Sequence, residues 1–187
     1  MPFRFITLEI PGLVLVKPQR FPDERGWFME SFKQSDFAKG GISEQFVQDN
    51  ISFSRQGVVR GLHYQSGRAA QGKLVTVLAG EIFDVGVDVR PRSEHYGRWA
   101  GVTLTADGGQ ALYIPPGFAH GFVVTSAEAL VCYKCTTEYN HNAERGIIWN
   151  DPSIGINWPV TDPIVSHKDR ELPLLPPRPE PGKDRPS

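Results

Sequence analysis

Residues 60–65 read Arg-Gly-Leu-His-Tyr-Gln and place a guanidinium and an imidazole three positions apart in an otherwise strand-like run. An imidazole titrates near pH ~6.5 and can act as a general base, whereas a guanidinium fork suits phosphate. Because alternate strand residues point to opposite faces, Arg60 and His63 share a site only if the strand twists or bulges, which Gly61 permits. The segment therefore predicts proton transfer beside a phosphate-binding group.

A second histidine follows a proline-glycine turn. Residues 113–122 read YIPPGFAHGF, and the P-x-G-x-x-H spacing up to His120 resembles the second motif of the cupin superfamily of jelly-roll barrels. In those barrels the histidine faces the interior and often binds a metal with a His-x-His pair from the first motif. Here the first motif would start at His63, and it holds one histidine only. Metal sites usually need three or more protein ligands, so we expect no metal and no other cofactor.

One strand carries both cysteines and a tyrosine. Cys132 and Cys135 spell C-x-x-C, but positions three apart on a strand point to opposite faces. With no second Cys/His pair, these cysteines are expected to be small packing residues. The same alternation puts Tyr133, Cys135 and Tyr139 on one face, where the Tyr133 hydroxyl could donate a proton or simply pack with its hydroxyl in water.

Three further charged residues allow two interpretations each. Lys73 opens a strand and is a solvated edge residue, unless it points inward and stabilises an oxyanion. Arg25 lies in the turn Asp-Glu-Arg-Gly and is either a surface residue or a phosphate ligand. Asp169 in Ser-His-Lys-Asp-Arg could orient an imidazole, although spacing alone favours a surface aspartate.

The elements that must position these residues are mostly strands. Short β-rich segments separated by turn residues predict strands at 46–53, 57–64, 73–79, 82–89, 100–105, 110–114, 119–125 and 129–137. Helical patterns are weak and fall at 34–39 and 162–165. Hairpin-length gaps such as Gly80-Glu81 predict an antiparallel all-β sandwich or barrel. We expect one domain over residues 1–175 and an extended or disordered tail over 176–187, because residues 171–187 hold six prolines.

Composition excludes several functional classes. The 187 residues include 21 acidic and 20 basic side chains, for a net charge of -1, which argues against a nucleic-acid-binding protein. No stretch has the ~18 apolar residues needed to cross a membrane, and Arg4, Glu9 and Pro11 interrupt the N-terminus, so no signal peptide is expected. Two cysteines make no disulfide framework, and the prediction is a cytoplasmic protein.

Taken together, the long motifs resemble the dTDP-4-dehydrorhamnose 3,5-epimerase family from about residue 4 to 175. The motifs that carry the resemblance are VVRGLHYQ, QGKLVTVLAGEIFDVGVDVR, YIPPGFAHGFVV, YKCTTEYNHNAERGIIWNDPSIGINWP and HKDRELPLL. The resemblance implies a metal-free jelly-roll (double-stranded β-helix) that forms a homodimer with strands exchanged between subunits. It implies epimerisation at C3 and C5 of dTDP-4-dehydro-6-deoxy-D-glucose to dTDP-4-dehydro-β-L-rhamnose.

The same resemblance implies roles for individual residues. His63 matches the general base, Asp169 its orienting partner, and Tyr133 the acid that returns a proton from the opposite face. Lys73 and His120 match groups near the sugar and its C4 oxygen. Tyr139 matches a ring that stacks on thymine, with Phe21 against the same base. The remaining positions match groups that bind nucleotide, diphosphate or sugar: Arg25, Glu30, Gln48, Asp49, Asn50, Arg60, Glu144 and Lys168.

Three alternatives remain open on the sequence. The first is an epimerase of a dTDP-4-keto-6-deoxy sugar that acts at C3 or C5 only. The second is a cupin that binds a sugar nucleotide without catalysis, and the third is a metal-dependent cupin oxygenase or isomerase. Exchange of solvent deuterium into the sugar tests the first two, and metal content with loss of activity to a chelator tests the third.

Overall fold

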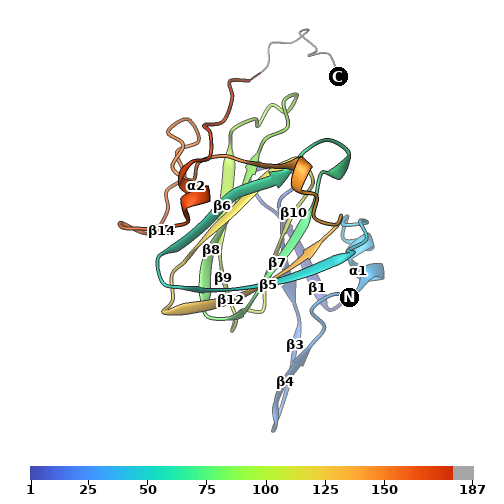
Figure 1. Ribbon diagram of the computed structural model, residues 1–187. Coiled ribbons are helices and arrows are strands. Elements are labelled where there is room, and N and C mark those ends of the chain that lie inside the picture. Colours follow the sequence, from blue (N-terminus) through green and yellow to red (C-terminus); the bar gives the residue numbers. More distant parts are fainter. Residues whose placement is uncertain (179–187) are drawn as a thin grey trace.

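Two antiparallel sheets face each other in the computed structural model, which describes residues 1–178 (Figure 1). The first sheet has the strand order β1-β2-β10-β7-β12-β5, and the second has the order β13-β6-β11-β8-β9 with β14 parallel to β6. The strands are β1 Phe3–Thr7, β2 Val14–Pro18, β3 Arg20–Asp23, β4 Gly26–Met29, β5 Gln48–Arg55, β6 Val58–Gln65, β7 Lys73–Ala79, β8 Glu81–Asp88, β9 Trp99–Thr105, β10 Ala111–Ile114, β11 Phe118–Val124, β12 Glu128–Cys135, β13 Glu144–Gly146 and β14 Ile164–Val165. The helices are α1 Gln34–Lys39 and α2 His167–Arg170, with 3-10 turns at Gly67–Ala69 and His141–Ala143.

Apolar side chains fill part of the space between the sheets. The main core cluster takes residues from both, including Val75, Val77 and Val131 from the first sheet and Ile82 and Phe122 from the second. Burial of a Val, Leu, Ile or Phe side chain stabilises a fold by about 1.5–3 kcal/mol, so this cluster holds the sheets together. The predicted all-β jelly roll is confirmed.

The outer face of each sheet has its own cover. Phe37 of α1 packs on the first sheet against Phe3 and Val16, with ring-centroid distances of 5.1 Å to Phe3. On the second sheet, Leu62 and Val87 pack against Ile154 from the C-terminal segment. The inner faces of the two sheets can therefore carry polar groups in the part of the space between them that the apolar core does not fill.

All eight predicted strands are present within two residues of their predicted ends, and the predicted helix at 34–39 is α1. The helix predicted at 162–165 is wrong, because this segment contains β14 and the helix begins later, at His167. The hairpin predicted at Gly80-Glu81 is also wrong: β7 and β8 belong to opposite sheets. The chain crosses from one sheet to the other at Gly80, which has a φ of +78. A Cβ at this position would lie 1.9 Å from the carbonyl oxygen of Glu128, so only glycine fits.

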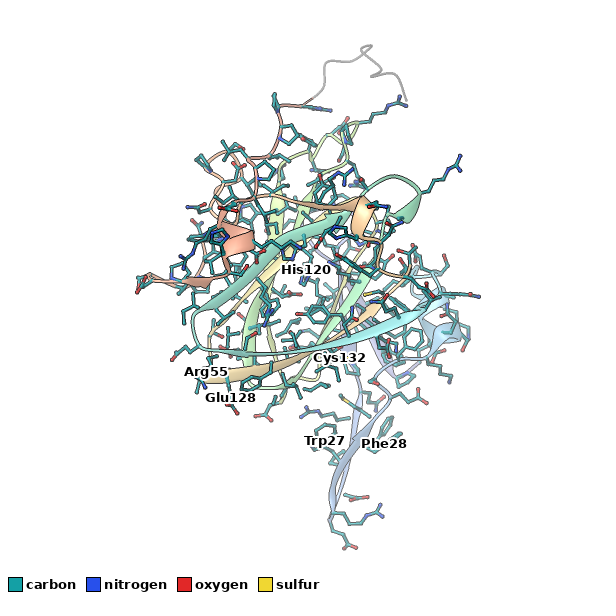
Figure 2. All side chains as sticks on the ribbon, in the orientation of Figure 1. Trp27, Phe28, Arg55, His120, Glu128 and Cys132 are labelled. Carbon is teal, nitrogen blue, oxygen red and sulfur yellow. The ribbon has the colours of Figure 1, made fainter. Side chains whose placement is uncertain are left out.

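The sequence analysis did not predict the four N-terminal strands. β1 and β2 extend the first sheet, whereas β3 and β4 form a separate hairpin that projects away from the barrel (Figures 1 and 2). Its aromatic side chains are exposed, with Phe21 at 44%, Trp27 at 53% and Phe28 at 66%. Most of the predicted tail, 179–187, lies outside the described residues.

A membrane-crossing helix is absent from residues 1–178, since both helices in that range are short and polar.

Candidate active site

A cavity of about 600 Å³ lies between the two sheets and the C-terminal segment that contains α2. Ten of the predicted site residues line it: Asn50, Arg60, His63, Lys73, His120, Tyr133, Tyr139, Glu144, Lys168 and Asp169. They come from six different strands, three of each sheet, from the segment that follows β12, and from α2. The fold thus brings together side chains as far apart in the sequence as Asn50 and Asp169.

A bulge in β6 puts Arg60 and His63 on the same side. His63 lies opposite His120 of β11 and Arg60 lies opposite Phe122, so two residues of β6 oppose one of β11. Gly61 occupies the bulge with φ +121, and a Cβ there would lie 2.6 Å from the Cα of Gly121. The expected bulge at glycine is confirmed, and its position explains why an arginine and a histidine three residues apart share one cavity.

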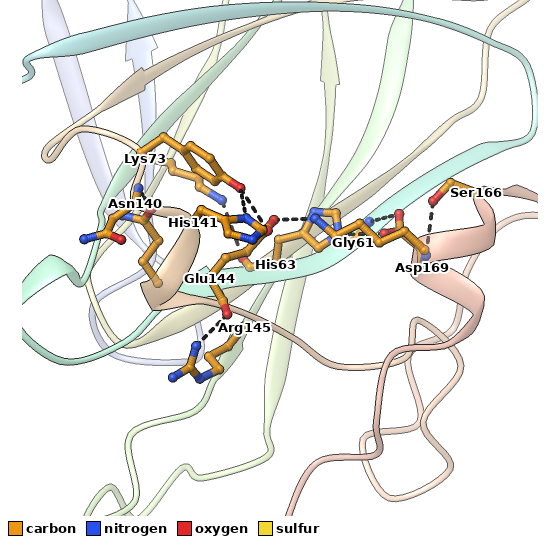
Figure 3. A network of polar contacts seen from close by, with 12 residues as sticks. Gly61, His63, Lys73, Asn140, His141, Glu144, Arg145, Ser166 and Asp169 are labelled. Atoms are coloured by element: carbon orange, nitrogen blue, oxygen red, sulfur yellow. Dashed lines mark hydrogen bonds and ion pairs between the residues drawn. The ribbon is translucent and has the colours of Figure 1, made fainter. Parts of the chain in front are cut away.

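His63 and Asp169 form a close pair (Figure 3). The Nε2 atom of His63 lies 2.7 Å from Oδ1 of Asp169, and the second carboxylate oxygen accepts a hydrogen bond from the Gly61 amide at 3.3 Å. Ser166 caps α2 by accepting from the Asp169 amide at 3.1 Å, which fixes the start of the helix. Burial alone would raise the pKa of Asp169, but hydrogen bonds from His63 and Gly61 and the charge of His63 hold the pKa below its ordinary value. The carboxylate therefore stays ionised and orients the imidazole with Nδ1 left for a substrate.

Lys73 points inward from the start of β7. Lys73 is half-buried in the cavity wall, and its Nζ donates a hydrogen bond to the His63 carbonyl oxygen at 3.5 Å. Burial lowers the pKa of Lys73, while nearby Cys135, Asp84 and Glu144 act to raise it. Of the two interpretations of Lys73, the structure supports the inward-facing cation.

His120 has a partner that the sequence analysis missed. Asp84 of β8 is fully buried and its Oδ1 lies 2.6 Å from Nε2 of His120. Burial raises the pKa of Asp84 and lowers the pKa of His120, and each partner opposes the shift of the other. The signal was present in the segment IFDVGVDV, where an aspartate interrupts the inward-facing side of a hydrophobic strand.

Tyr133 faces the cavity from β12, in the sheet opposite His63. Its ring lies 6.0 Å from the His120 ring and 6.4 Å from the Phe122 ring. Its hydroxyl lies 2.9 Å from Oγ of Ser52 on the neighbouring strand β5. Burial raises the pKa of Tyr133, so the phenol is protonated at neutral pH and can donate its proton. Cys135 follows on the same face, whereas Cys132 lies on the outer face, as predicted.

A polar cluster forms one wall of the cavity. Tyr139 donates a hydrogen bond to Glu144 at 3.0 Å, and Lys168 donates to the other carboxylate oxygen at 2.7 Å. The Lys168 ammonium lowers the pKa of Glu144, and the hydrogen bond to Glu144 raises the pKa of Tyr139. Gln48 and Gln65 fix this segment by accepting from the amides of residues 139 and 140 at 2.8 and 2.6 Å. The Tyr139 ring remains 54% exposed and accessible to a ligand.

The remaining predicted residues lie outside the cavity of this chain. Phe21 and Arg25 lie on the projecting hairpin, where Arg25 pairs with Asp23 at 2.6 Å. Glu30 follows this hairpin and is half-buried. Asp49 lies on the outer face of β5, paired with Lys134 at 2.8 Å, because strand alternation places it opposite to Asn50.

Within residues 1–178, no three His, Cys, Asp or Glu side chains are arranged to hold a metal ion. The groups in the cavity supply acid–base chemistry instead. An oriented imidazole and a protonated phenol approach from opposite sheets, the half-buried Lys73 provides positive charge, and Arg60 and Lys168 can bind an anion. This combination suits removal and return of a proton at a carbon next to a carbonyl group.

Comparison with known proteins agrees with this chemistry. The family model described as dTDP-4-dehydrorhamnose 3,5-epimerase matches residues 7–176. The chain belongs to this family of epimerases. A family member from Methanothermobacter thermautotrophicus is 50% identical over 171 residues, which cover 90% of this chain and 92% of the relative.

Two crystal structures of family members share the architecture. The epimerase of Elizabethkingia anophelis superposes with a TM-score of 0.90 at 40% identity and covers 94% of this chain and 97% of its own. The epimerase of Legionella pneumophila, solved in complex with dTDP-4-keto-L-rhamnose, has a TM-score of 0.89 at 46% identity and covers 92% and 93%. The protein is thus an epimerase by its sequence, and its fold agrees.

Proposed function

We propose that the protein inverts C3 and C5 of dTDP-4-dehydro-6-deoxy-D-glucose and forms dTDP-4-dehydro-β-L-rhamnose, in dTDP-L-rhamnose biosynthesis. The observation that carries this proposal is the single cavity in which the His63–Asp169 pair and the Tyr133 phenol come from opposite sheets. The names of the most similar relatives support the same substrate.

The C4 ketone makes the hydrogens at C3 and C5 acidic, because either carbanion delocalises onto the carbonyl oxygen. His63 removes the proton, and the electron pair of the C–H bond moves into an enolate. Positioned proton transfer of this kind contributes about 10²–10⁴-fold. Lys73 and His120 stabilise the negative charge on the oxygen, and Tyr133 gives its proton to the other face of the carbon.

The nucleotide serves to hold the sugar in register. Arg60 is fixed by a hydrogen bond from Nε to Ser54 at 2.9 Å and by one from Nη2 to the Phe53 carbonyl oxygen at 3.2 Å, and its remaining N–H groups can bind the diphosphate. Tyr139 stacks on thymine, while Asn50, Gln48, Glu144 and Lys168 bind the nucleotide or sugar. Binding energy from these remote groups is what keeps the reacting carbons next to His63 and Tyr133.

A homodimer with strand exchange belongs to the same proposal. The hairpin exposes Phe21, Trp27 and Phe28, and the outer face of the first sheet exposes Ile51 and Phe53 on its edge strand β5. Several large apolar side chains exposed on one surface are typical of a surface that another subunit covers. In a dimer, Phe21, Arg25 and Glu30 of one subunit reach the cavity of the other. A cytoplasmic location fits the two free cysteines.

Solvent exchange tests the reaction. The protein is incubated with dTDP-4-dehydro-6-deoxy-D-glucose in deuterated water, and the sugar is analysed by mass spectrometry and NMR. We expect deuterium at both C3 and C5. Label at one carbon would identify a single-centre epimerase, and binding of dTDP-sugar without any exchange would identify a binding protein. Stoichiometric metal with activity lost to a chelator would instead support a metal-dependent cupin.

Mixing two inactive variants tests the shared site. His63→Ala and Arg25→Ala proteins are each assayed alone and then after joint refolding. If Arg25 serves the neighbouring cavity, a mixed dimer has one cavity with both defects and one with neither, so activity returns. No recovery from mixtures that sedimentation shows to be dimeric would refute strand exchange.

A further inference from the structure

The edge strand β5 sends two serines toward the cavity, and each contacts a different functional group. Ser52 lies 2.9 Å from the Tyr133 hydroxyl, and Ser54 accepts a hydrogen bond from Nε of Arg60 at 2.9 Å. They are two residues apart and therefore share a face of the strand. The reaction proposed above leaves Ser52 without a role.

The pairing of β5 with β12 sets this contact. Tyr133 lies opposite Asn50, and Ser52 lies opposite Val131, so the serine and the tyrosine are diagonal neighbours on the inward face. Within residues 1–178, Ser52 is the only side chain that hydrogen-bonds to the Tyr133 hydroxyl. Ser52 is itself half-buried, at the border between the cavity and the strand edge.

We propose that Ser52 is a positioning residue for proton return: its hydroxyl donates a hydrogen bond to the Tyr133 oxygen and leaves the phenol proton directed at the substrate carbon. The proposal rests on Tyr133 acting as the acid in the proposed reaction. A phenol that donated to Ser52 would have its only proton turned away from the sugar. With Ser52 as donor, the tyrosine oxygen accepts one hydrogen bond and its proton stays available.

The same hydrogen bond strengthens as the reaction proceeds. When Tyr133 gives up its proton, the O–H bond breaks, the electron pair of the enolate forms the new C–H bond, and a phenolate remains. The enolate oxygen becomes the C4 carbonyl again, and water later returns a proton to the phenolate as His63 releases one. Burial disfavours the phenolate and raises the pKa of Tyr133, whereas the Ser52 hydrogen bond acts to lower it. A donor aimed at charge that appears only during the reaction accelerates the chemical step and not substrate binding.

Three variants test this role. Ser52→Ala removes the hydroxyl, Ser52→Thr keeps it, and Ser54→Ala is a matched control on the same strand that removes a contact to Arg60. Each is assayed for kcat, KM and dTDP affinity, and for deuterium in recovered substrate relative to inverted product. That ratio reports how often His63 removes a proton that Tyr133 fails to replace from the other face.

We expect Ser52→Ala to lower kcat by about 10- to 100-fold, the effect of a hydrogen bond to a charged group, with KM and dTDP affinity within about twofold. The ratio of labelled substrate to inverted product should rise, and Ser52→Thr should restore both values to within about threefold of the unmodified protein. Ser54→Ala should instead raise KM and leave the ratio unchanged.

Two results would overturn the proposal. One is an unchanged ratio and kcat in Ser52→Ala, and the other is a raised KM with an unchanged ratio, which would make Ser52 a ligand contact. If Ser52→Ala fails to fold, Ser52→Cys keeps the volume with a much weaker donor and must show the same rise in the ratio. Absence of exchange and inversion in the unmodified protein would refute the proposed reaction itself, so the two failures are distinct.

Discussion

Replacing Asp169 with asparagine keeps the shape of the side chain but forces a conflict in its hydrogen bonds. One carboxylate oxygen lies 2.7 Å from Nε2 of His63, and the other accepts from the Gly61 amide at 3.3 Å. An asparagine has one acceptor and one NH2 group for these two positions. If the asparagine oxygen faces His63, its NH2 group faces the Gly61 amide, and two donors meet without an acceptor. This arrangement costs about 1–3 kcal/mol of unfolding free energy. With its NH2 toward His63, the imidazole proton moves to Nδ1, the nitrogen that must act as base.

Either arrangement slows proton removal. Loss of the negative charge removes the group that stabilises the imidazolium formed on proton removal, and the reversed tautomer blocks the base, so we expect deuterium exchange at both carbons to fall by about 10²–10⁴-fold. dTDP affinity, measured by calorimetry, should stay within a few-fold, because Asp169 contacts the imidazole and not the nucleotide site. Glu171→Gln, an exposed carboxylate beside the same helix, is the control and should leave exchange unchanged.

The same variant has a defined effect on stability against pH. The pKa of Asp169 is lowered in the folded protein, so the ionised carboxylate stabilises the fold above its ordinary pKa of ~3.9. That contribution is lost as pH falls through the lowered pKa, and in Asp169→Asn this part of the acid-side loss should disappear. Exchange within threefold of the unmodified protein in a folded Asp169→Asn would refute the assignment of His63 and Asp169 as a working pair.

Three further outcomes follow from the geometry. Because burial lowers the pKa of Lys73, its ammonium is lost as pH rises through a value below 10.5, and kcat should fall on the alkaline side. Asp84→Asn removes a negative charge that raises the pKa of Lys73, so this variant should move the fall in kcat to lower pH. An unmoved pH profile would argue against Lys73 as the charged group. Gly61→Ala should reduce the unfolding free energy in urea by at least about 2 kcal/mol, since its Cβ would meet the backbone of β11. The loss should exceed that of Gly26→Ala, whose φ of +133 is close to the +121 of Gly61 but whose Cβ would have no neighbour within 4 Å; equal losses would contradict the close approach. Tyr133→Phe should block inversion more than deuterium entry into the substrate, and equal loss of both would contradict its role as the acid of the second face.

Local pattern was sufficient for most of the strands. In segments such as KLVTVLA at 73–79, successive side chains point to opposite faces of the sheet, and turn residues follow the segment. The presence of a strand and its approximate ends therefore follow from short-range geometry. The partner of each strand does not follow in this way. Gly80-Glu81 has the length of a hairpin, yet it connects two sheets, because the barrel core requires β7 and β8 on opposite sides.

The weakly patterned segments were harder to interpret. β1 to β4 lie in a stretch interrupted by prolines and charges, and β3 with β4 exposes its aromatic side chains instead of burying them. Strand prediction rests on a buried face, and a hairpin without one in its own chain carries little signal. For the same reason Phe21 could be predicted as a ligand only through family resemblance, and Arg25 was left with two interpretations until that resemblance was considered.

Sequence alone determined the residue types of the site, the alternation that puts Tyr133 and Cys135 together, and the glycine that allows Arg60 and His63 to face one cavity. Tertiary structure decided which distant groups meet: Asp169 reaches His63 across 106 positions, Asp84 pairs with His120, and Asp49 turns away to Lys134. Alternation and bulges are local properties of the backbone, so a sequence reports them directly. Pairing of a carboxylate with an imidazole depends on how the chain crosses between sheets, and only the packed core sets that path.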